Sequence, residues 1–198
     1  GHFVRACLDK KINAWGIEEN DNLVRFGNKK VRGRILQSKS TNLEHIIKKY
    51  KINCLSLIFV LEHLKDPNYI FKIFRQTEVE YLYLALPMAS LVIYFENILE
   101  EVFPRQLGGT HTHLFTNESI NYIKKKYKLK ILGEWWFGTD FADLYRSTNV
   151  YLKKNKNNEN NFINKFNQIF LSKIDDFQSI LDKKKQSSEV HIIFKKKK

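Results

Sequence analysis

The chain has few cysteines and no long apolar run. Cys7 and Cys54 are the only cysteines among its 198 residues. Both lie in apolar contexts and lack the spacing of metal ligands, so we expect reduced core thiols in a cytoplasmic protein. No apolar stretch reaches the roughly 18 residues needed to cross a bilayer, and no signal peptide is visible. These absences exclude a cysteine-held metal site and predict no membrane span.

Composition predicts a folded domain. The chain is 43% hydrophobic and 14% aromatic, which supplies a core and excludes disorder of the whole. We therefore expect one α/β domain over residues 1–198. The formal charge of +13 suggests nucleic acid or an anionic membrane. However, the lysines are scattered, many beside asparagines, in runs at 48–51, 124–126, 183–185 and 195–198. This pattern favours solvated helix faces and argues against a nucleic-acid partner.

The most informative stretch is residues 53–67. Its mostly apolar part, residues 54–60, is short and bounded by polar residues, which predicts a strand buried on both faces. Glu62 and His63 follow at the carboxyl end, where open α/β sheets hold their ligands. Asp66 and Pro67 then predict the start of a helix, with Asp66 as its cap.

This stretch resembles one part of a known enzyme family. Residues 60–64, VLEHL, and the following Asp66-Pro67 are similar to the fourth strand and loop of class I S-adenosylmethionine-dependent methyltransferases. Asn53 departs from the aspartate usual at the start of that strand. The resemblance implies a Rossmann-like sheet that is mostly parallel, with an antiparallel last strand beside the fifth. It also implies S-adenosyl-L-methionine as cofactor.

The start of the chain matches the family only in part. A helix is predicted directly after Gly1, which matches the last glycine of the family's D-x-G-x-G loop, with Phe3 two residues on. We therefore expect the first strand and the acidic residue to be missing from this chain. That strand would lie in the middle of the sheet, between residues 12–18 and 53–59.

The resemblance assigns cofactor contacts to six residues. Gly1 approaches the cofactor because a Cβ would collide with it, and Phe3 accompanies it. Glu18 ends a predicted strand about seventeen residues later and would bind both ribose hydroxyls, although it could instead cap the helix at 20–29. Gln37, after a predicted edge strand at 31–36, is a candidate for the adenine amine. Leu61 and Glu62 complete the set, and Glu62 could instead orient a neighbour or cap a helix.

A second motif, THTHLFT, occupies residues 110–116. His111 and His113 are two apart, so both would face the same way on an extended segment. The motif resembles the loop that covers the substrate in this methyltransferase branch. We expect His63 or His111, with His113 as a further candidate, to act as catalytic base, while a purely structural role stays open. Two histidines alone lack the further ligands that zinc needs, so no metal is expected.

The C-terminal third offers an aromatic run and a helical insertion. Trp135, Trp136 and Phe137 end a predicted strand at 129–137 and form either an acceptor-binding wall or core. Residues 133–147 also resemble, more softly, methyltransferases of polysaccharide and secondary-metabolite pathways. This resemblance implies that three polar residues line the acceptor pocket, although they could equally be charges on a helix surface: Asp140, Asp143 and Arg146.

Residues 140–185 are predicted as a helical insertion before the last strand, serving as a lid or a homodimer contact. Within it, residues 153–161 suggest an exposed loop and 164–184 an amphipathic helix.

Taken together, the residues predict methyl transfer to a small-molecule or saccharide-type acceptor. Two alternatives stay open: a non-catalytic methyltransferase-like domain, and a nucleic-acid methyltransferase, although no N/D-P-P-Y/F motif for base methylation is present. If the chain is a methyltransferase, we expect the turn that carries Glu18 and the turn that carries Glu62 and His63 to border one cleft large enough for a nucleoside.

Overall fold

The computed structural model describes residues 1–99, 104, 106, 108–154 and 160–197 of the chain. These residues form two compact units, Gly1–Ile52 and Asn53–Lys198, each of which is described by itself. Among the described residues, no helix is both long enough and apolar enough to cross a membrane. The single domain over residues 1–198 stays a prediction.

The first unit is a two-stranded parallel sheet with its helices. Its elements are α1 (His2–Asp9), β1 (Gly16–Glu18), α2 (Asp21–Val31), β2 (Ile35–Gln37), η1 (Ser40–Asn42) and α3 (Leu43–Tyr50). Helix α1 begins directly after Gly1, as predicted. A small apolar cluster of Val4, Val24, Val31 and Ile35 joins the two N-terminal helices to β2.

Both strands of the first unit are shorter than predicted. Only Gly16–Glu18 of the expected strand 12–18 is paired, in register with Ile35–Gln37. Val31, expected to open the second strand, is the last residue of α2 instead. The chain reverses after it through Arg32 and Gly33, whose φ angles of 51° and 77° lie in the left-handed region that ends helices.

The second unit is built on a four-stranded sheet. Its strands are β3 (Cys54–Ile58), β4 (Tyr81–Pro87), β5 (Leu129–Phe137) and β6 (Glu189–Lys196). Its helices are η2 (Leu61–His63), α4 (Asn68–Gln76), α5 (Leu91–Ile98), α6 (Asn117–Lys126), α7 (Asp140–Lys154), α8 (Asn160–Phe170), η3 (Leu171–Lys173) and α9 (Ile174–Lys183). Helix α4 starts one residue after Pro67, and Asp66 accepts a hydrogen bond from the Asn68 N–H at 3.0 Å, as expected of a cap. The apolar spacing of residues 90–102 predicts one helix; α5 covers Leu91–Ile98 of it, and part of the predicted range lies outside the described residues.

The strand order is β3-β4-β6-β5, so the last strand, β6, lies between β4 and β5. This confirms the predicted antiparallel last strand. Strand β6 pairs antiparallel with both β4 and β5, while β3 pairs parallel with β4. The described strands fall into two sheets, with two parallel and two antiparallel pairings, so their arrangement is mixed where a mostly parallel sheet was expected. The presence of a further strand upstream of Gly1 stays a prediction.

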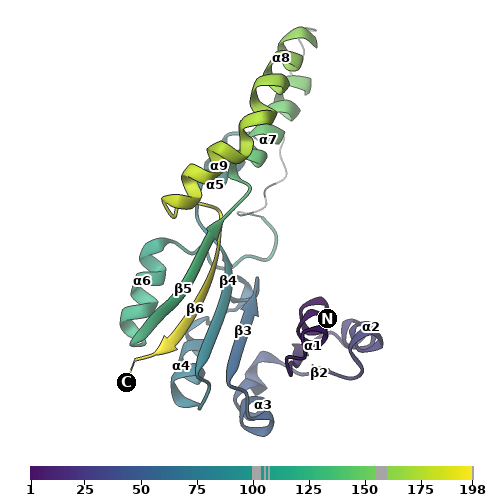
Figure 1. Ribbon diagram of the computed structural model, residues 1–198, viewed down its shortest axis with the longest axis vertical. Coiled ribbons are helices and arrows are strands. Elements are labelled where there is room, and N and C mark those ends of the chain that lie inside the picture. Colours follow the sequence, from purple (N-terminus) through teal and green to yellow (C-terminus); the bar gives the residue numbers. More distant parts are fainter. Residues whose placement is uncertain (100–103, 105, 107, 155–159, 198) are drawn as a thin grey trace. The chain divides into compact units, whose positions relative to one another are not determined.

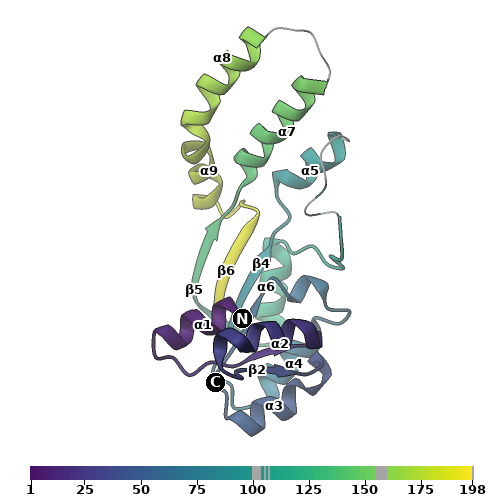
Figure 2. The same ribbon diagram turned by 90° about the vertical axis from the view of Figure 1, so that its right-hand side faces the viewer.

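One face of this sheet carries the core. Helices α4 and α6 lie on the same side of the strands (Figure 2), and the Phe71 ring of α4 stacks on Tyr127 with centroids 5.1 Å apart. Leu82, Leu84 and Ile192 are enclosed, whereas Cys54 and Ser56 of β3 are exposed. The prediction that this strand is buried on both faces, and that Cys54 is a core thiol, is therefore wrong within this unit. Alternate residues of β3 face the side away from α4 and α6.

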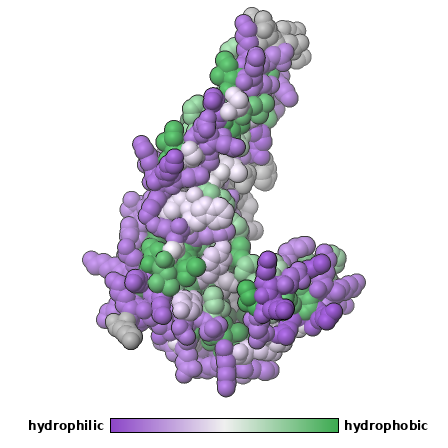
Figure 3. All heavy atoms as spheres, in the orientation of Figure 1, coloured by the Kyte–Doolittle hydropathy of each residue, from purple (hydrophilic) through white to green (hydrophobic). Residues whose placement is uncertain are grey.

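The helices α7, α8 and α9 stand between β5 and β6 in the sequence and continue beyond the ends of these strands (Figure 1). Aromatic contacts join them: Tyr145 of α7 stacks on Phe166 of α8 with centroids 5.9 Å apart, and Phe141 of α7 packs at a tilt on Phe177 of α9 at 5.2 Å. Hydrophobic side chains also reach the surface of this part (Figure 3), including Ile169 and Ile180. The helix predicted at 164–184 is interrupted by η3, and the loop predicted at 153–161 partly lies outside the described residues.

Candidate functional site

The site is built on the corner where β3 ends. Phe59, the first residue after β3, has a φ of 51°, a left-handed conformation that is unfavourable for a bulky residue. Its backbone N–H still donates to the Ala85 carbonyl at 3.0 Å, so β4 holds the corner in place. The 3₁₀ turn η2 follows at once and carries Glu62 and His63. The structure therefore places both residues at the carboxyl end of the parallel pair β3–β4.

A second segment, residues 110–113, is tied to this corner through one carbonyl group. The Glu62 carbonyl oxygen accepts hydrogen bonds from the Thr112 N–H at 2.9 Å, the His113 N–H at 3.2 Å and the Thr112 hydroxyl at 2.9 Å. The Thr112 hydroxyl also lies 3.2 Å from the Leu64 carbonyl. These contacts link loops that are about fifty residues apart in sequence.

These hydrogen bonds between the two loops place His111 next to His63 and Glu62. The His63 and His111 ring centroids are 4.8 Å apart. His63 Nε2 lies 3.7 Å from Glu62 Oε1. One potential ligand atom from each of these residues falls within 4.8 Å of the others. We call Glu62, His63 and His111 the corner cluster.

The outer nitrogens of both imidazoles face oxygen atoms. His63 Nδ1 lies 3.2 Å from the Thr110 carbonyl oxygen and 3.0 Å from the Thr110 hydroxyl. His111 Nδ1 lies 3.2 Å from the Gln106 carbonyl oxygen. A carbonyl oxygen can only accept, so these contacts are hydrogen bonds in the tautomer that carries its hydrogen on Nδ1. In that tautomer the lone pair of each neutral ring is on Nε2.

The carboxylate of Glu62 is enclosed. The residue is 1% exposed, and neither carboxylate oxygen accepts a hydrogen bond of ordinary geometry from the residues described. Burial raises the pKa of this carboxyl, while its own backbone N–H and the nearby His63 and His111 act in the opposite direction. An acidic group held in this way is available to a proton or a cation inside the corner.

His113 does not belong to the corner cluster. Its ring packs against Phe115 with centroids 6.4 Å apart, and its Nδ1 lies 2.9 Å from the Thr112 hydroxyl. The expectation that His111 and His113 share one environment is therefore wrong, because the hydrogen bonds of Thr112 and His113 to the Glu62 carbonyl bend the segment around that atom. His111 is paired with His63 instead. The sequence offered no signal for this pairing, since it depends on a contact between distant loops.

The residues expected to bind the cofactor fall into both units. In the first unit, Glu18 and Gln37 are register partners at the carboxyl ends of β1 and β2, as sequence reasoning required. Glu18 Oε1 accepts the Asn20 N–H at 2.9 Å, while the Asn20 side chain caps α2. Glu18 therefore braces the start of this helix and is still partly exposed.

Gly1 and Leu61 are placed by packing. A Cβ added to Gly1 would meet Ile35 Cδ1 at 3.0 Å, so a neighbouring side chain already limits this position. Phe3, by contrast, is 49% exposed and free to meet a ligand. Leu61 is fully enclosed in the second unit, and Glu62 belongs to the corner cluster.

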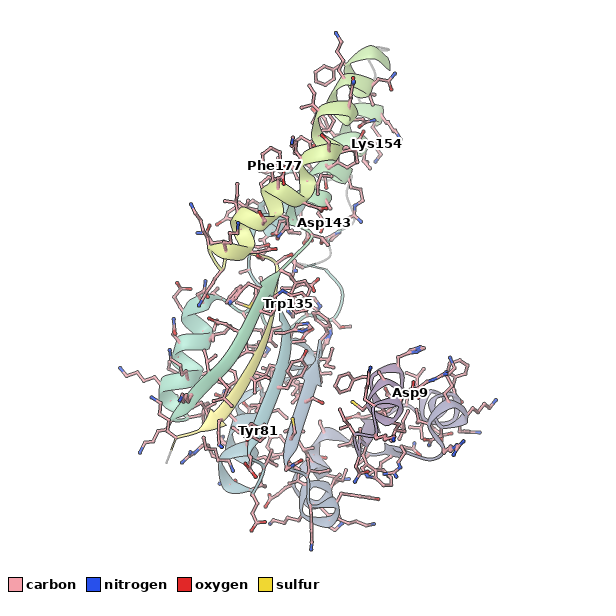
Figure 4. The ribbon with its side chains drawn as sticks, in the orientation of Figure 1. Asp9, Tyr81, Trp135, Asp143, Lys154 and Phe177 are labelled. Carbon is pink, nitrogen blue, oxygen red and sulfur yellow. The ribbon has the colours of Figure 1, made fainter. Side chains whose placement is uncertain are left out.

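The aromatic run divides between surface and core. Trp135 is 63% exposed on β5 (Figure 4) and stacks on Phe137 with centroids 4.5 Å apart. His191 of β6 contacts both rings and pairs with the Tyr83 hydroxyl at 2.7 Å. Trp136 is buried. The expected wall thus consists of Trp135 and Phe137, while Trp136 belongs to the core.

The polar residues that follow this run have a structural role. Asp140 is 1% exposed and accepts hydrogen bonds from the Ser188 N–H at 2.9 Å and the Gln178 side chain at 3.2 Å. Asp143 is also buried and pairs with Arg146 at 3.1 Å. Figure 4 shows Asp143 at the base of the helical extension. The Asp140 contacts fasten α7 to α9 and to the residue before β6, whereas the Asp143–Arg146 pair lies within α7. Both carboxylates are buried, so Asp140 and Asp143 are not helix-surface charges.

Comparisons with known proteins support the fold. No model of a protein family matches the chain, and no curated protein matches it. Among solved structures, a SAM-dependent methyltransferase from Archaeoglobus fulgidus is similar at TM-score 0.55 and 16% identity, over 99% of this chain and 81% of that one. The methyltransferase domain of bacterial CtHen1 and the MccD protein each match at TM-score 0.52, with 14% and 12% identity, over 98% of this chain and 84% of theirs. The chain therefore has an α/β fold resembling that of methyltransferases.

Proposed function

We propose that the protein transfers a methyl group from S-adenosyl-L-methionine to a small-molecule or saccharide-type acceptor. The observation that carries the proposal is the corner cluster at the carboxyl end of β3, within a fold similar to that of a SAM-dependent methyltransferase. Ligands of open α/β sheets bind at this edge. The exposed Trp135 ring, stacked on the partly buried Phe137, supports a planar or saccharide acceptor, because both kinds of ligand pack on aromatic faces.

The roles follow from the chemistry of a sulfonium donor. Its methyl group is already activated, so alignment and exclusion of water supply most of the acceleration. A base is needed only where the acceptor must lose a proton. His63 and His111 have Nε2 lone pairs suited to this task, and His113 is the further candidate. Gly1, Phe3, Glu18, Gln37, Leu61 and Glu62 are proposed to contact the cofactor.

Calorimetry with S-adenosylhomocysteine tests the cofactor. We expect one binding site per chain, weakened about 10- to 100-fold by Glu18→Ala, since hydrogen bonds to a charged group contribute about 1.5–3 kcal/mol. Glu19→Ala is the matched control: this neighbouring carboxylate accepts the Ser40 N–H at 3.1 Å and has no proposed cofactor role. Equal weakening by both substitutions, or no binding by the unsubstituted protein, would favour a non-catalytic methyltransferase-like domain.

A hollow in the first unit favours a nucleic-acid acceptor as the second candidate. Its lining includes the cations Lys11, Arg34, Lys49 and Lys51 together with Trp15 and Tyr50. The Arg34 guanidinium lies 4.5 Å from the Trp15 ring centroid, and the rings of Trp15 and Tyr50 are 4.6 Å apart. Partly exposed rings among cations suit single-stranded nucleic acid. Binding of a single-stranded oligonucleotide that weakens with salt and is lost in Lys49→Ala/Lys51→Ala would support this candidate.

A further inference from the structure

The corner cluster contains an enclosed carboxylate that lacks a hydrogen-bonding partner in the described part of the chain. Glu62 is 1% exposed, and neither carboxylate oxygen accepts a hydrogen bond of ordinary geometry from the described residues. An ionised carboxylate in such a position costs several kcal/mol unless a cation or hydrogen bonds compensate it. The atom facing it at 3.7 Å is His63 Nε2, which carries a lone pair when the ring is neutral. A carboxylate and a lone pair directed at the same space are complementary to a cation.

The histidines are oriented as metal ligands are. Metal-binding imidazoles commonly donate their other N–H to a backbone carbonyl, which fixes the tautomer and the ring plane. His63 Nδ1 and His111 Nδ1 are placed for this contact, 3.2 Å from the carbonyl oxygens of Thr110 and Gln106 respectively. Both rings therefore keep Nε2 for a ligand. Thr112, through its bonds to the Glu62 carbonyl, holds the two loops at this spacing.

The separations require only a modest adjustment. The three candidate ligand atoms lie within 4.8 Å of one another. Ligand atoms about 2.0–2.2 Å from a zinc ion stand roughly 3.5 Å apart in a tetrahedral site, so the side chains must close in by about 1 Å. The His63 side chain is 36% exposed, which leaves its ring room to move.

We propose that Glu62, His63 and His111 bind a divalent first-row transition-metal ion, with zinc as the reference ion. Two imidazole nitrogens and one carboxylate oxygen suit Zn²⁺, Mn²⁺ or Fe²⁺ better than Ca²⁺ or Mg²⁺, which prefer oxygen ligands. Three protein ligands leave a position open for water or an acceptor oxygen. Sequence reasoning missed this site because it paired His111 with His113 and counted no third ligand.

The ion would also redistribute the proposed roles. With Nε2 of His63 and His111 coordinated, neither ring accepts a proton, so His113 remains as the histidine base of the proposed methyl transfer. Binding of the ion does not itself rest on the proposed function, because it is measured without cofactor or acceptor.

The test is calorimetric titration of Zn²⁺ into the full chain, freed of any affinity tag and stripped with a chelator. We expect one ion per chain, with affinity reduced by more than about 100-fold in Glu62→Gln and His111→Gln, a loss larger than that for removing an outer partner of a ligand. His113→Gln and His191→Gln are matched controls, because they remove histidines outside the corner cluster. Both should keep the unsubstituted affinity.

Several results would overturn the proposal. They are the absence of stoichiometric Zn²⁺ binding, equal loss in His113→Gln, and Mg²⁺ binding as tight as Zn²⁺ binding. Circular dichroism checks that Glu62→Gln folds; should it not, the partly exposed His111→Gln decides. S-adenosylhomocysteine is titrated separately, so zinc binding without cofactor binding refutes only the proposed function, and the converse refutes only the metal site.

Discussion

The two compact units differ in how tightly their cores are packed. The largest fully buried side chains of the described residues all belong to the second unit, among them Phe71, Phe74 and Phe194. The cluster of the first unit consists of three valines and Ile35, most of them 6–8% exposed. The corner cluster therefore stands on a rigid base, whereas the proposed ribose and adenine contacts stand on two three-residue strands. The proposed catalytic histidines would then lie on the tightly packed second unit, and the proposed ribose and adenine contacts on the more loosely packed first unit.

The largest expected effect comes from the same deletion made in each core. Ile192 lies on β6 in the second unit and is 0% exposed, while Ile35 lies on β2 in the first and is 7% exposed. Replacing isoleucine by alanine in a core costs about 2–5 kcal/mol, depending on how far the site can collapse. We expect Ile192→Ala near the upper end and Ile35→Ala near the lower, measured by peptide-resolved hydrogen exchange in each unit. Equal losses would remove the contrast in packing.

For the loss of a side-chain hydrogen bond, we expect the first unit to lose more stability than the second, the reverse of the core substitutions. The Asn28 side chain donates to the Ile35 carbonyl at 2.9 Å and accepts the Ile35 N–H at 2.8 Å. Asn28→Ala loses both bonds and should cost about 1–3 kcal/mol. Thr112→Val should cost about 1 kcal/mol, because the Glu62 carbonyl keeps two backbone donors. Urea denaturation monitored in each unit makes the comparison; a greater cost for Thr112→Val would show that the corner depends on that hydroxyl.

Helix caps should show no difference between the units. Asn20 caps α2 by accepting the N–H groups of Asn22 and Leu23, and Thr116 caps α6 in a reciprocal arrangement with Ser119. We expect Asn20→Ala and Thr116→Ala to cost about 1 kcal/mol each, since capping is a local interaction. Thermal denaturation provides the measurement. A cost confined to one unit would mean that tertiary context also governs the caps.

The smallest expected effect is a pH dependence of the second unit. Burial among aromatic rings lowers the pKa of His191. The stability that its neutral form contributes is present above the unfolded pKa of about 6.5 and is lost as pH falls through the lower folded value. The urea midpoint of this unit should therefore fall between pH 7 and pH 5, less steeply in His191→Gln. An unchanged slope in that variant would assign the dependence to other groups.

Local chemistry alone determined much of this protein. Asp66 and Pro67 predicted the start of α4, and the strand predicted at 129–137 is β5 with those bounds. The position of Glu62-His63 after a strand predicted the corner of the site. Such features depend on neighbours in sequence, so the sequence contains them. The bounds of β1 and β2 were missed because short strands depend on pairing partners more than on their own pattern.

Only the tertiary structure decided which residues meet at the corner. His111 lies against His63 because the backbone of residues 112–113 and the Thr112 hydroxyl converge on one carbonyl oxygen across about fifty residues. The burial of Glu62, the exposure of β3 and the separation of Trp136 from Trp135 likewise depend on which element packs against which face. A periodic pattern states that a face is apolar, but the partner that covers it is fixed only when the chain folds.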